Sequence, residues 1–416
     1  MREESGEVAA TSAPHAGNAP RLLLIGGGRE GQEMMEDAAS LGIRLLNINN
    51  HGGFKQGFLP FVEQAFIADY SNASLIIPVA KALHGAMPVD AVISLTEDGL
   101  VPASWVNEAL GMAGESVATV EAFKDKVIMR RRLADAGVSP VQFCQLEGEE
   151  DALAFLGSHG ASIIKPADGA GSRGIYLVST AQDVRDAMDA LGTAGASRLL
   201  MEEFLSGQEI SVEAFSFDGT HHILAMTDKM TNARFVEIGH RMPSVLDGAA
   251  KEDVAELVLR FLDVMGLRNG PTHTEIKLTS RGPRIIESHN RVGGDRINEL
   301  VKCCFGFSLK GLAMAWACRQ VSAWTQAPLP TAYAEIAFLL PPVGRVACIE
   351  GVDAAMAVPG SVEVRIDVAV GDCISTVASS RDRAGHVIAQ GTSREEARAR
   401  VEKMASRVSI QTIQEE

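Results

Sequence analysis

The sequence predicts an α/β fold in its N-terminal part and an α+β fold in its C-terminal part. Short apolar strands alternate with helical segments between residues 21 and 110, a rhythm typical of a doubly wound parallel sheet. From residue 162 onward, paired strands close around glycine-containing turns, which favours antiparallel sheets. The 416 residues are enough for two or three domains.

The composition is that of an ordinary soluble protein, with 46% hydrophobic and 22% charged residues. A net charge of −15 argues against nucleic acid or an anionic membrane as the main partner. We find no signal peptide and no apolar run long enough to cross a bilayer. The six cysteines show no metal-binding spacing. We therefore expect a cytoplasmic protein with neither nucleic-acid nor membrane partners.

Residues 1–20 are expected to be a disordered leader, and residues 21–115 an N-terminal α/β domain. Its first strand, Arg21–Ile25, runs into the glycine-rich turn Gly26–Gly31. A dinucleotide site would need an acidic residue after the next strand, Ile43–Ile48, but asparagines follow that strand. The turn is better interpreted as a tight connection, open to contact with a carboxylate substrate. The other expected elements are helices at Gln32–Leu41, Ser74–Leu83 and Val101–Leu110 and strands at Phe66–Ala68 and Ala91–Leu95.

Residues 116–200 are predicted to form a central domain. One long helix, Thr119–Ala136, carries Lys126. Two strands enclose the glycine-rich loop Lys165–Gly174, whose backbone N–H groups suit either a lid over phosphates or a plain surface turn. The expected elements are strands at Gln142–Leu146, Ser162–Lys165 and Ile175–Val178, helices at Asp151–Gly157 and Thr180–Leu191, and a strand at Leu199–Glu202.

Residues 201–416 are predicted to form a C-terminal domain that includes a tail subdomain at 332–416. The segment Phe235–Ser244 is expected to be a polar loop in which His240 is either a pocket residue or a structural one. The segment Asp295–Gln320 is expected to be largely helical. The other expected elements are strands at Ile210–Phe217, His222–Met230, Ala334–Leu340, Val362–Val368, Thr376–Ala378 and His386–Gly391 and helices at Ala250–Met265 and Ser393–Arg407.

The hairpin Thr272–Asn290 carries the strongest chemical signal in the chain. If its strands pair about Arg281, Glu275 and Glu287 face each other, because side chains alternate with period two. Facing carboxylates repel, and a hard cation with oxygen ligands from both strands would offset that repulsion. Together with Arg291 nearby, the pair suits phosphoryl chemistry with Mg²⁺. The alternative is a pair of solvated surface acids.

Four motifs, in this order, resemble those of the ATP-grasp superfamily: Phe123–Lys126, Ile164–Gly174, Glu202–Glu209, and Glu275 with Glu287–Arg291. The resemblance covers residues 21–410. It implies the ATP-grasp fold, with an N-terminal parallel-sheet domain, a small lid domain and a C-terminal antiparallel-sheet domain.

The resemblance implies ATP as cofactor, with phosphate contacts from Lys126, Lys165 and Ser172. It implies a hinge whose backbone meets adenine, at Glu202, Glu203 and Leu205. It also implies an acid that binds the ribose hydroxyls, which matches Glu209.

Two Mg²⁺ ions are implied, with Glu275 and Glu287 as the matching ligands. Many members carry an asparagine ligand two residues after the second glutamate, but His289 stands there in this chain. The third ligand is therefore open between His289, the Asn290 backbone and water.

The catalytic arginine of the family matches Arg291, and Gly293 and Gly294 are expected to hold the carboxylate and the tetrahedral intermediate. His240, Asp295 and Arg296 are hypotheses for substrate selection, because their loops should border the same cavity.

Within the superfamily the chain resembles bacterial L-amino-acid ligases, on the segments Glu237–Ser244, Arg291–Arg296 and Gly385–Gly391. This implies an acyl phosphate made from a carboxylate and ATP, then attack by an amine to give a dipeptide-like amide, as in peptide antibiotic synthesis. The implied partners are small molecules, and a homodimer stays open because such enzymes are often dimers. The rival interpretations are another ATP-grasp ligase or carboxylase, a nicotinamide-dependent oxidoreductase and a non-catalytic nucleotide-binding protein.

Overall fold

The computed structural model describes residues 19–28, 31–169, 171, 173–196 and 198–414. The chain divides into two compact units. The first takes in the chain up to Val117 together with Lys310–Thr325, and the second takes in Ala118–Leu309 and the chain from Gln326 onward. The predicted leader at residues 1–20 falls almost wholly outside the described residues.

The first unit is built on a four-stranded parallel sheet of order β3-β2-β1-β4, which confirms the predicted doubly wound α/β class. Leu22–Ile25 of β1 are completely buried, as expected of a strand covered on both faces. Helices α2 and α3 pack on the face that carries Leu23 and Ile25. The elements are β1 Arg21–Ile25, α1 Gly31–Ser40, β2 Arg44–Asn49, η1 Gln56–Phe61, β3 Val62–Ile67, α2 Ala73–Ala86, β4 Ala91–Ile93, α3 Leu100–Leu110 and, for the most part, α10 Leu309–Ala317.

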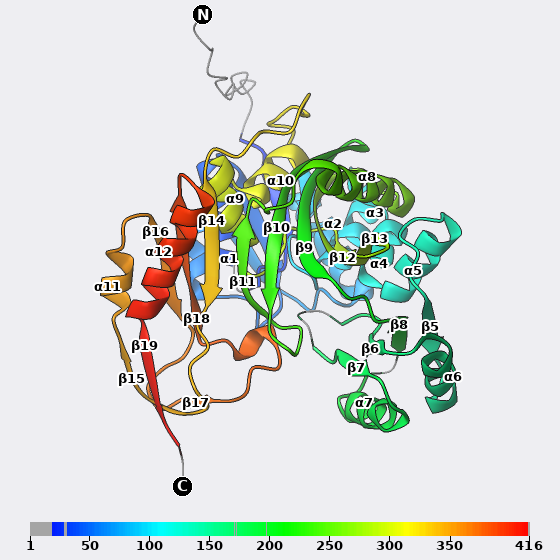
Figure 1. Cartoon of the computed structure of the whole chain (residues 1–416). Helices are drawn as coiled ribbons and strands as arrows, with labels where there is room; N and C mark the ends of the chain where they lie inside the picture. Colours follow the sequence, from blue (N-terminus) through cyan, green and yellow to red (C-terminus); the bar gives the residue numbers. More distant parts are fainter. Residues whose placement is uncertain (1–18, 29–30, 170, 172, 197, 415–416) are drawn as a thin grey trace, which may run out of the picture. The chain divides into compact units, whose positions relative to one another are not determined.

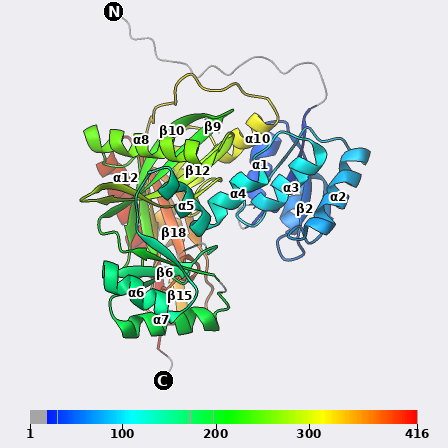
Figure 2. The same ribbon diagram turned by 90° about the vertical axis from the view of Figure 1, so that its right-hand side faces the viewer.

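Within the second unit, a small antiparallel sheet of order β5-β8-β6-β7 carries the glycine-rich loop. Helices α6 and α7 pack against it (Figure 1; Figure 2). Thr180 and Asp183 form the capping box that begins α7. The elements are β5 Phe143–Leu146, α6 Glu149–His159, β6 Ser162–Pro166, β7 Tyr176–Val178, α7 Ala181–Thr193 and β8 Leu199–Glu203.

An eight-stranded antiparallel sheet of order β13-β12-β9-β10-β11-β14-β18-β16 is the largest sheet described in the second unit (Figure 1). Helices α4, α5 and α8 bury one face of β9, β12 and β13, whereas α12 packs on β14 and β18. The elements are α4 Val117–Lys124, α5 Lys126–Asp135, β9 Gln208–Phe217, β10 Thr220–Thr231, β11 Glu237–Met242, α8 Gly248–Met265, β12 Gly270–Thr279, β13 Gly282–His289, α9 Ile297–Phe305, β14 Tyr333–Phe338, β16 Ser361–Ile366, β18 Gly385–Gly391 and α12 Arg394–Arg407.

The tail adds a three-stranded sheet of order β17-β15-β19. Its elements are β15 Gly344–Glu350, α11 Val352–Met356, β17 Cys373–Ile374, η2 Ser380–Asp382 and β19 Ser409–Ile413. The predicted strand at Thr376–Ala378 is wrong, because the strand ends at Ile374 and the chain turns toward η2. Helix α11 and strand β19 were not predicted.

Two further expectations about secondary structure are wrong. Phe235–Ser244 is not a loop throughout, because Glu237–Met242 pairs with β10 and β14 as strand β11. The helix expected at Thr119–Ala136 is broken at Asp125, whose backbone is extended (φ −97°, ψ 107°). The Asp125 carboxylate accepts hydrogen bonds from the backbone N–H groups of Val127 and Ile128, so a new helix begins at Lys126. In addition, α4 and α5 pack beneath the large sheet, although the predicted central domain began at residue 116.

The Asp125 cap gives a direct stability prediction. Asp125→Ala removes both capping bonds and the ion pair with Arg198, and we expect the free energy of unfolding to fall by about 0.5–2 kcal/mol. Asp135→Ala, at the exposed end of the same helix, is the control and should change it by less than about 0.5 kcal/mol. Urea unfolding followed by circular dichroism measures both, and equal midpoints for the two variants would contradict the assigned cap.

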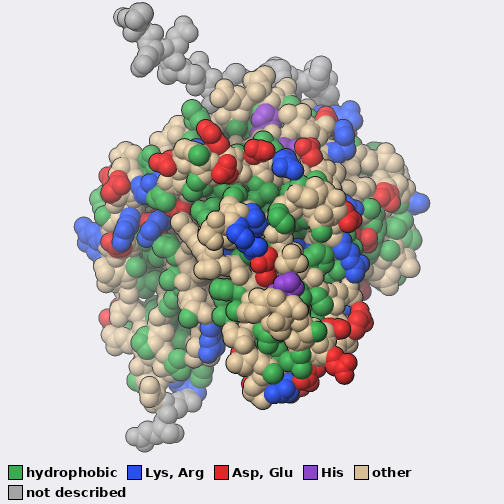
Figure 3. Space-filling model, turned by 45° about the vertical axis from the view of Figure 1, so that its right-hand side comes forward, with side chains coloured by type: hydrophobic (Ala, Val, Ile, Leu, Met, Phe, Trp, Pro, Cys, Tyr) green, Lys and Arg blue, Asp and Glu red, His purple; other side chains and the backbone are tan. Residues whose placement is uncertain are grey.

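Acidic and basic side chains are interspersed on the face of the molecule drawn in Figure 3. Among the described residues, no single helix is long and apolar enough to cross a membrane. Helices α9 and α10 meet that test only when taken together, across the break between them.

Candidate active site

The candidate site lies on the face of the large sheet that is turned away from α8. Along β12, Ile276 packs in the core, whereas Glu275 and Lys277 line a cleft. The same alternation on β9 buries Ile210 and leaves Glu209 in the cleft lining. Because side chains alternate between the two faces of each strand, acidic and basic groups from several strands lie on one face of the sheet.

The hairpin register is the predicted one, because Glu275 pairs directly with Glu287 across β12 and β13. The register shifts just beyond this pair, between Glu275 and Ile276, where the next pairing is Ile276 with Ile285. This bulge leaves one extra residue, Ile286, on β13. At this bulge the buried Arg130 side chain donates hydrogen bonds to the backbone carbonyls of Ile285 and Ile286.

Both facing carboxylates are ionised at neutral pH. Burial opposes ionisation of Glu275, and Glu287 repels it, but Lys229 and His273 lower the pKa of Glu275 to about 2. Burial likewise opposes ionisation of Glu287, but the charge of Lys126 holds its pKa well below the usual range. Two ionised carboxylates on adjacent strands fit a divalent cation with oxygen ligands.

Lys126 connects the second carboxylate to the glycine-rich loop. As the first residue of α5, it places its Nζ 3.0 Å from Glu287 Oε2 and 2.5 Å from the carbonyl oxygen of Gly169. Ser172 of the same loop lies outside the described residues. Lys126 is therefore held between the loop and the predicted metal ligand Glu287.

A cleft with about 680 Å³ of empty space, which includes open solvent, runs along strand β8. Its lining includes most of the residues predicted to contact ATP, together with both carboxylates and several apolar side chains. Such a mixture of apolar walls and a few charged groups is typical of a nucleotide pocket. The predicted site residues in the lining are Lys165, Glu202, Glu203, Leu205, Glu209, Glu275 and Glu287.

The Glu202 carboxylate is occupied by two cations. It binds the Arg130 guanidinium, and its other oxygen lies 2.5 Å from Lys165 Nζ. Burial opposes ionisation, but these two cations lower the pKa of Glu202 to about 2. Arg130 also donates to the bulge carbonyls of Ile285 at 2.8 Å and Ile286 at 3.0 Å. Sequence reasoning missed Arg130, whose only signal was a charged residue on the buried face of a helix.

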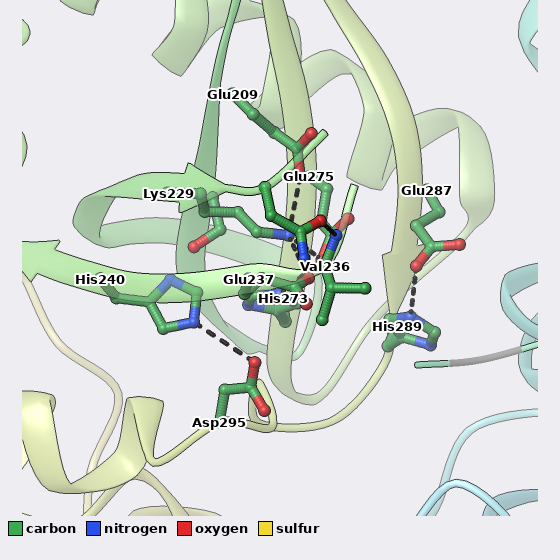
Figure 4. A network of polar contacts seen from close by, with 12 residues as sticks. Glu209, Lys229, Val236, Glu237, His240, His273, Glu275, Glu287, His289 and Asp295 are labelled. Atoms are coloured by element: carbon green, nitrogen blue, oxygen red, sulfur yellow. Dashed lines mark hydrogen bonds and ion pairs between the residues drawn. The ribbon is translucent and has the colours of Figure 1, made fainter. Parts of the chain in front are cut away.

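Lys229 was also missed, and it lies among three acids from three strands (Figure 4). Its Nζ is 2.6 Å from Glu275, 2.8 Å from Glu209 and 3.2 Å from Glu237. Burial disfavours the ammonium, but Glu275, Glu209 and Glu237 raise its pKa well above the usual value. These acids are close enough together to hold a cation, and the Lys229 ammonium already lies among them.

The His273 side chain lies between the carboxylates of Glu213 and Glu275. Its Nδ1 lies 2.7 Å from the buried Glu213, and its Nε2 lies 3.3 Å from Glu275. Burial opposes protonation, but Glu213 and Glu275 raise the pKa of His273 to about 9, so the imidazole is charged at neutral pH.

Gly293 gives His273 its space, since a methyl group at Gly293 would approach Nδ1 of His273 to 2.5 Å. Gly293→Ala should therefore displace His273 and lower the free energy of unfolding by about 1–3 kcal/mol. Gly294→Ala is the matched control for stability, because no atom lies within 4 Å of the added methyl group. Thermal unfolding of both variants measures the difference, and an unchanged melting temperature for Gly293→Ala would show that His273 can move freely.

The structure places Arg291 immediately after the carboxylate strand, half-buried, with Nη1 donating to the carbonyl of Val292 at 3.0 Å. Arg291 is absent from the described lining of the cleft. Its predicted contact with the acyl phosphate therefore stays a prediction, as does the contact predicted for Gly293 and Gly294.

The three residues predicted to select substrate lie in two adjoining ion-pair groups. Asp295 binds the Arg383 guanidinium, which stacks 3.6 Å from the Phe338 ring centroid, and His240 Nε2 lies 3.4 Å from Asp295. Arg296 binds Glu363 at 2.7 Å. Burial opposes ionisation of Asp295, but bonds from Arg383 and His240 lower its pKa below the usual value.

Asp295 and Arg296 both adopt a left-handed backbone, with φ of 54° and 64°. Non-glycine residues are uncommon there, and strain of this kind clusters at functional sites. Arg383, which lies 88 residues beyond Asp295 in the sequence, was missed because only the tertiary fold brings it there.

Family models match most of the chain. The ATP-grasp N-terminal domain matches residues 35–114, the ATP-grasp domain residues 159–299, and the L-amino acid ligase C-terminal domain 2 residues 337–412. The crystal structure of L-amino acid ligase from Bacillus licheniformis matches with a TM-score of 0.83 and 20% identity, over 96% of this chain and 100% of that chain.

Among curated proteins, alanine--anticapsin ligase of Bacillus subtilis is 32% identical over 268 residues, which are 58% of this chain and 56% of that protein. Dapdiamide A synthase of Enterobacter agglomerans is 25% identical over 235 residues, 53% of this chain and 54% of that protein. The alignments thus span little more than half the length of these two relatives.

The chain belongs to the ATP-grasp superfamily, as the two ATP-grasp models show, and its fold agrees. Its tail matches the L-amino acid ligase C-terminal domain 2, and from this segment Arg383 binds Asp295 while stacking on Phe338.

Proposed function

We propose that the protein is an ATP-dependent carboxylate–amine ligase. It joins an amino-acid-like carboxylate to an L-amino acid through an acyl phosphate and releases ADP and phosphate. The observation that carries the proposal is the facing pair Glu275 and Glu287, next to Lys126 and to a cleft lined by both charged and apolar side chains.

The donor set fits Mg²⁺, because two ionised carboxylate oxygens face each other while cations hold the remaining oxygens. Glu275 and Glu287 would hold the ion or ions, with His289, the Asn290 backbone or water as further ligand. When bound, the cation neutralises the developing charge on the phosphates and positions them.

The first chemical step needs positioning and charge compensation rather than a protein nucleophile. The substrate carboxylate attacks the γ-phosphate of ATP, and ADP leaves. In this proposal Lys126 and Lys165 compensate the phosphate charges. The backbone of Glu202, Glu203 and Leu205 meets adenine, and Glu209 meets the ribose hydroxyls.

In the second step the amine attacks the acyl carbon, and phosphate leaves. Arg291 with the Gly293–Gly294 backbone would hold the developing oxyanion, and the loop Lys165–Gly174 would exclude water from the acyl phosphate. His240, Asp295 and Arg296 would shape the substrate pocket.

The names of two relatives, alanine--anticapsin ligase and dapdiamide A synthase, favour a role in peptide antibiotic or secondary metabolite synthesis. A cytoplasmic location and a homodimer stay predictions, and light scattering of the purified protein would measure the second.

Oxygen transfer tests the mechanism. With an ¹⁸O-labelled carboxylate substrate, the proposal expects one ¹⁸O atom in the released phosphate, because the acyl phosphate breaks at its acyl carbon. Label in AMP would indicate an adenylate instead. Label in neither product, with ADP formed only when bicarbonate is present, would favour a carboxylase.

A further inference from the structure

The side chain of His289 lies on the same face of β13 as the carboxylate of Glu287. The two residues are two apart on one strand, so their side chains point the same way (Figure 4). Ser288, between them, points to the opposite face, where its hydroxyl bonds that of Thr274 at 2.8 Å. The alternation therefore gives the predicted metal ligand Glu287 an imidazole neighbour.

The two side chains are spaced like ligands of one ion. His289 Nε2 lies 3.4 Å from Glu287 Oε1, while Glu287 Oε2 is held by Lys126 at 3.0 Å. Two bonds of about 2.1–2.2 Å to one cation, at slightly more than a right angle, give that separation. The pair is also largely shielded, with side-chain exposures of 9% for His289 and 18% for Glu287.

The chemistry of this pair differs from an all-oxygen site. Mg²⁺ takes oxygen ligands in a near-octahedral shell, whereas imidazole nitrogen favours first-row transition ions. The Asn290 side chain also carries an oxygen, Oδ1, which is buried without a partner among the described residues. Asn290 follows the last residue of β13, so alternation does not direct it toward Glu287.

We propose that Glu287 and His289 together form a mixed oxygen–nitrogen site that prefers a first-row transition dication, such as Mn²⁺, to Mg²⁺. The proposal rests on the proposed function, because it concerns the cation that accompanies the nucleotide. Glu275 completes the protein ligands from the facing strand.

Pulsed EPR of Mn²⁺ bound to the full chain with ADP tests this directly. The wild-type protein should show modulation from a directly bound ¹⁴N nucleus, and the pattern should change when the protein is labelled with ¹⁵N-histidine. His289→Asn should remove the nitrogen signal. His51→Asn, an exposed histidine in the first unit, is the control and should retain it.

Competition between Mn²⁺ and Mg²⁺ gives a second readout. The wild type should bind Mn²⁺ more tightly, and His289→Asn should shift the Mn²⁺-to-Mg²⁺ affinity ratio about tenfold toward Mg²⁺. Mn²⁺ binding with ADP but without histidine nitrogen overturns the mixed site and leaves the ligase proposal standing. Failure of ADP and cation to bind at all overturns both. Labelling of the wild type decides the question even if the variant does not fold.

Discussion

Glu287→Gln is expected to lower the rate of ADP formation by about a thousandfold while the chain stays folded. The change removes one of the two facing charges, and with it a cation ligand and the ion-pair partner of Lys126. It also relieves the repulsion between Glu287 and Glu275 but leaves the buried Lys126 ammonium without this anion, so the free energy of unfolding should fall by about 1–3 kcal/mol. A coupled ADP assay and circular dichroism measure the two effects.

Glu252→Gln, on the exposed face of α8, is the control and should retain full activity. If Glu287→Gln turned over at the wild-type rate, the pair could not be the cation site, and the hairpin would be an ordinary strand pair with acids on its surface.

Arg130→Met is expected to lower the free energy of unfolding by about 3–5 kcal/mol. The guanidinium is almost completely buried and joins α5 to β8 through Glu202 and to the bulge of β13 through two carbonyls. Methionine fills much of the volume but leaves both carbonyls without their donor and leaves Glu202 with Lys165 alone.

Arg131→Met, one residue further along the same helix, tests the specificity of that effect. Arg131 is exposed and donates a hydrogen bond to the Gln145 side chain at 3.0 Å, so its loss should cost less than about 1 kcal/mol. Urea midpoints for the two variants give the comparison. Equal losses would mean that the Arg130 bonds contribute no more than a surface contact.

The sequence was sufficient for the hairpin because the information there is local. A turn between Thr279 and Gly282 and strict alternation along two short strands determine that Glu275 meets Glu287. The parallel N-terminal sheet was predictable for a similar reason, since each apolar strand is followed by its own helix.

The roles of the basic side chains Lys229 and Arg383 could not be predicted, because they depend on acidic partners distant in sequence. Lys229 forms ion pairs with Glu209, Glu237 and Glu275, which lie on three different strands. Arg383 meets Asp295 only after the tail has folded onto β14. A buried charged residue carries no signal in one sequence until its partner is known.

The break at Asp125 shows a different limit. Residues 117–135 contain neither glycine nor proline, so the sequence alone predicts one helix. The chain changes direction at Asp125 because the Asp125 side chain caps the next helix and pairs with Arg198. That break is what brings Lys126 to Glu287 and Gly169.

The most direct test of the ligase proposal is product analysis. The purified protein is incubated with ATP, Mg²⁺ or Mn²⁺, and pooled amino acids and amino-acid-like carboxylates, and the products are separated by mass. The proposal predicts ADP and phosphate in equal amounts, together with a new mass equal to the sum of two substrates less one water. AMP with pyrophosphate, or ADP without any new amide, would contradict it.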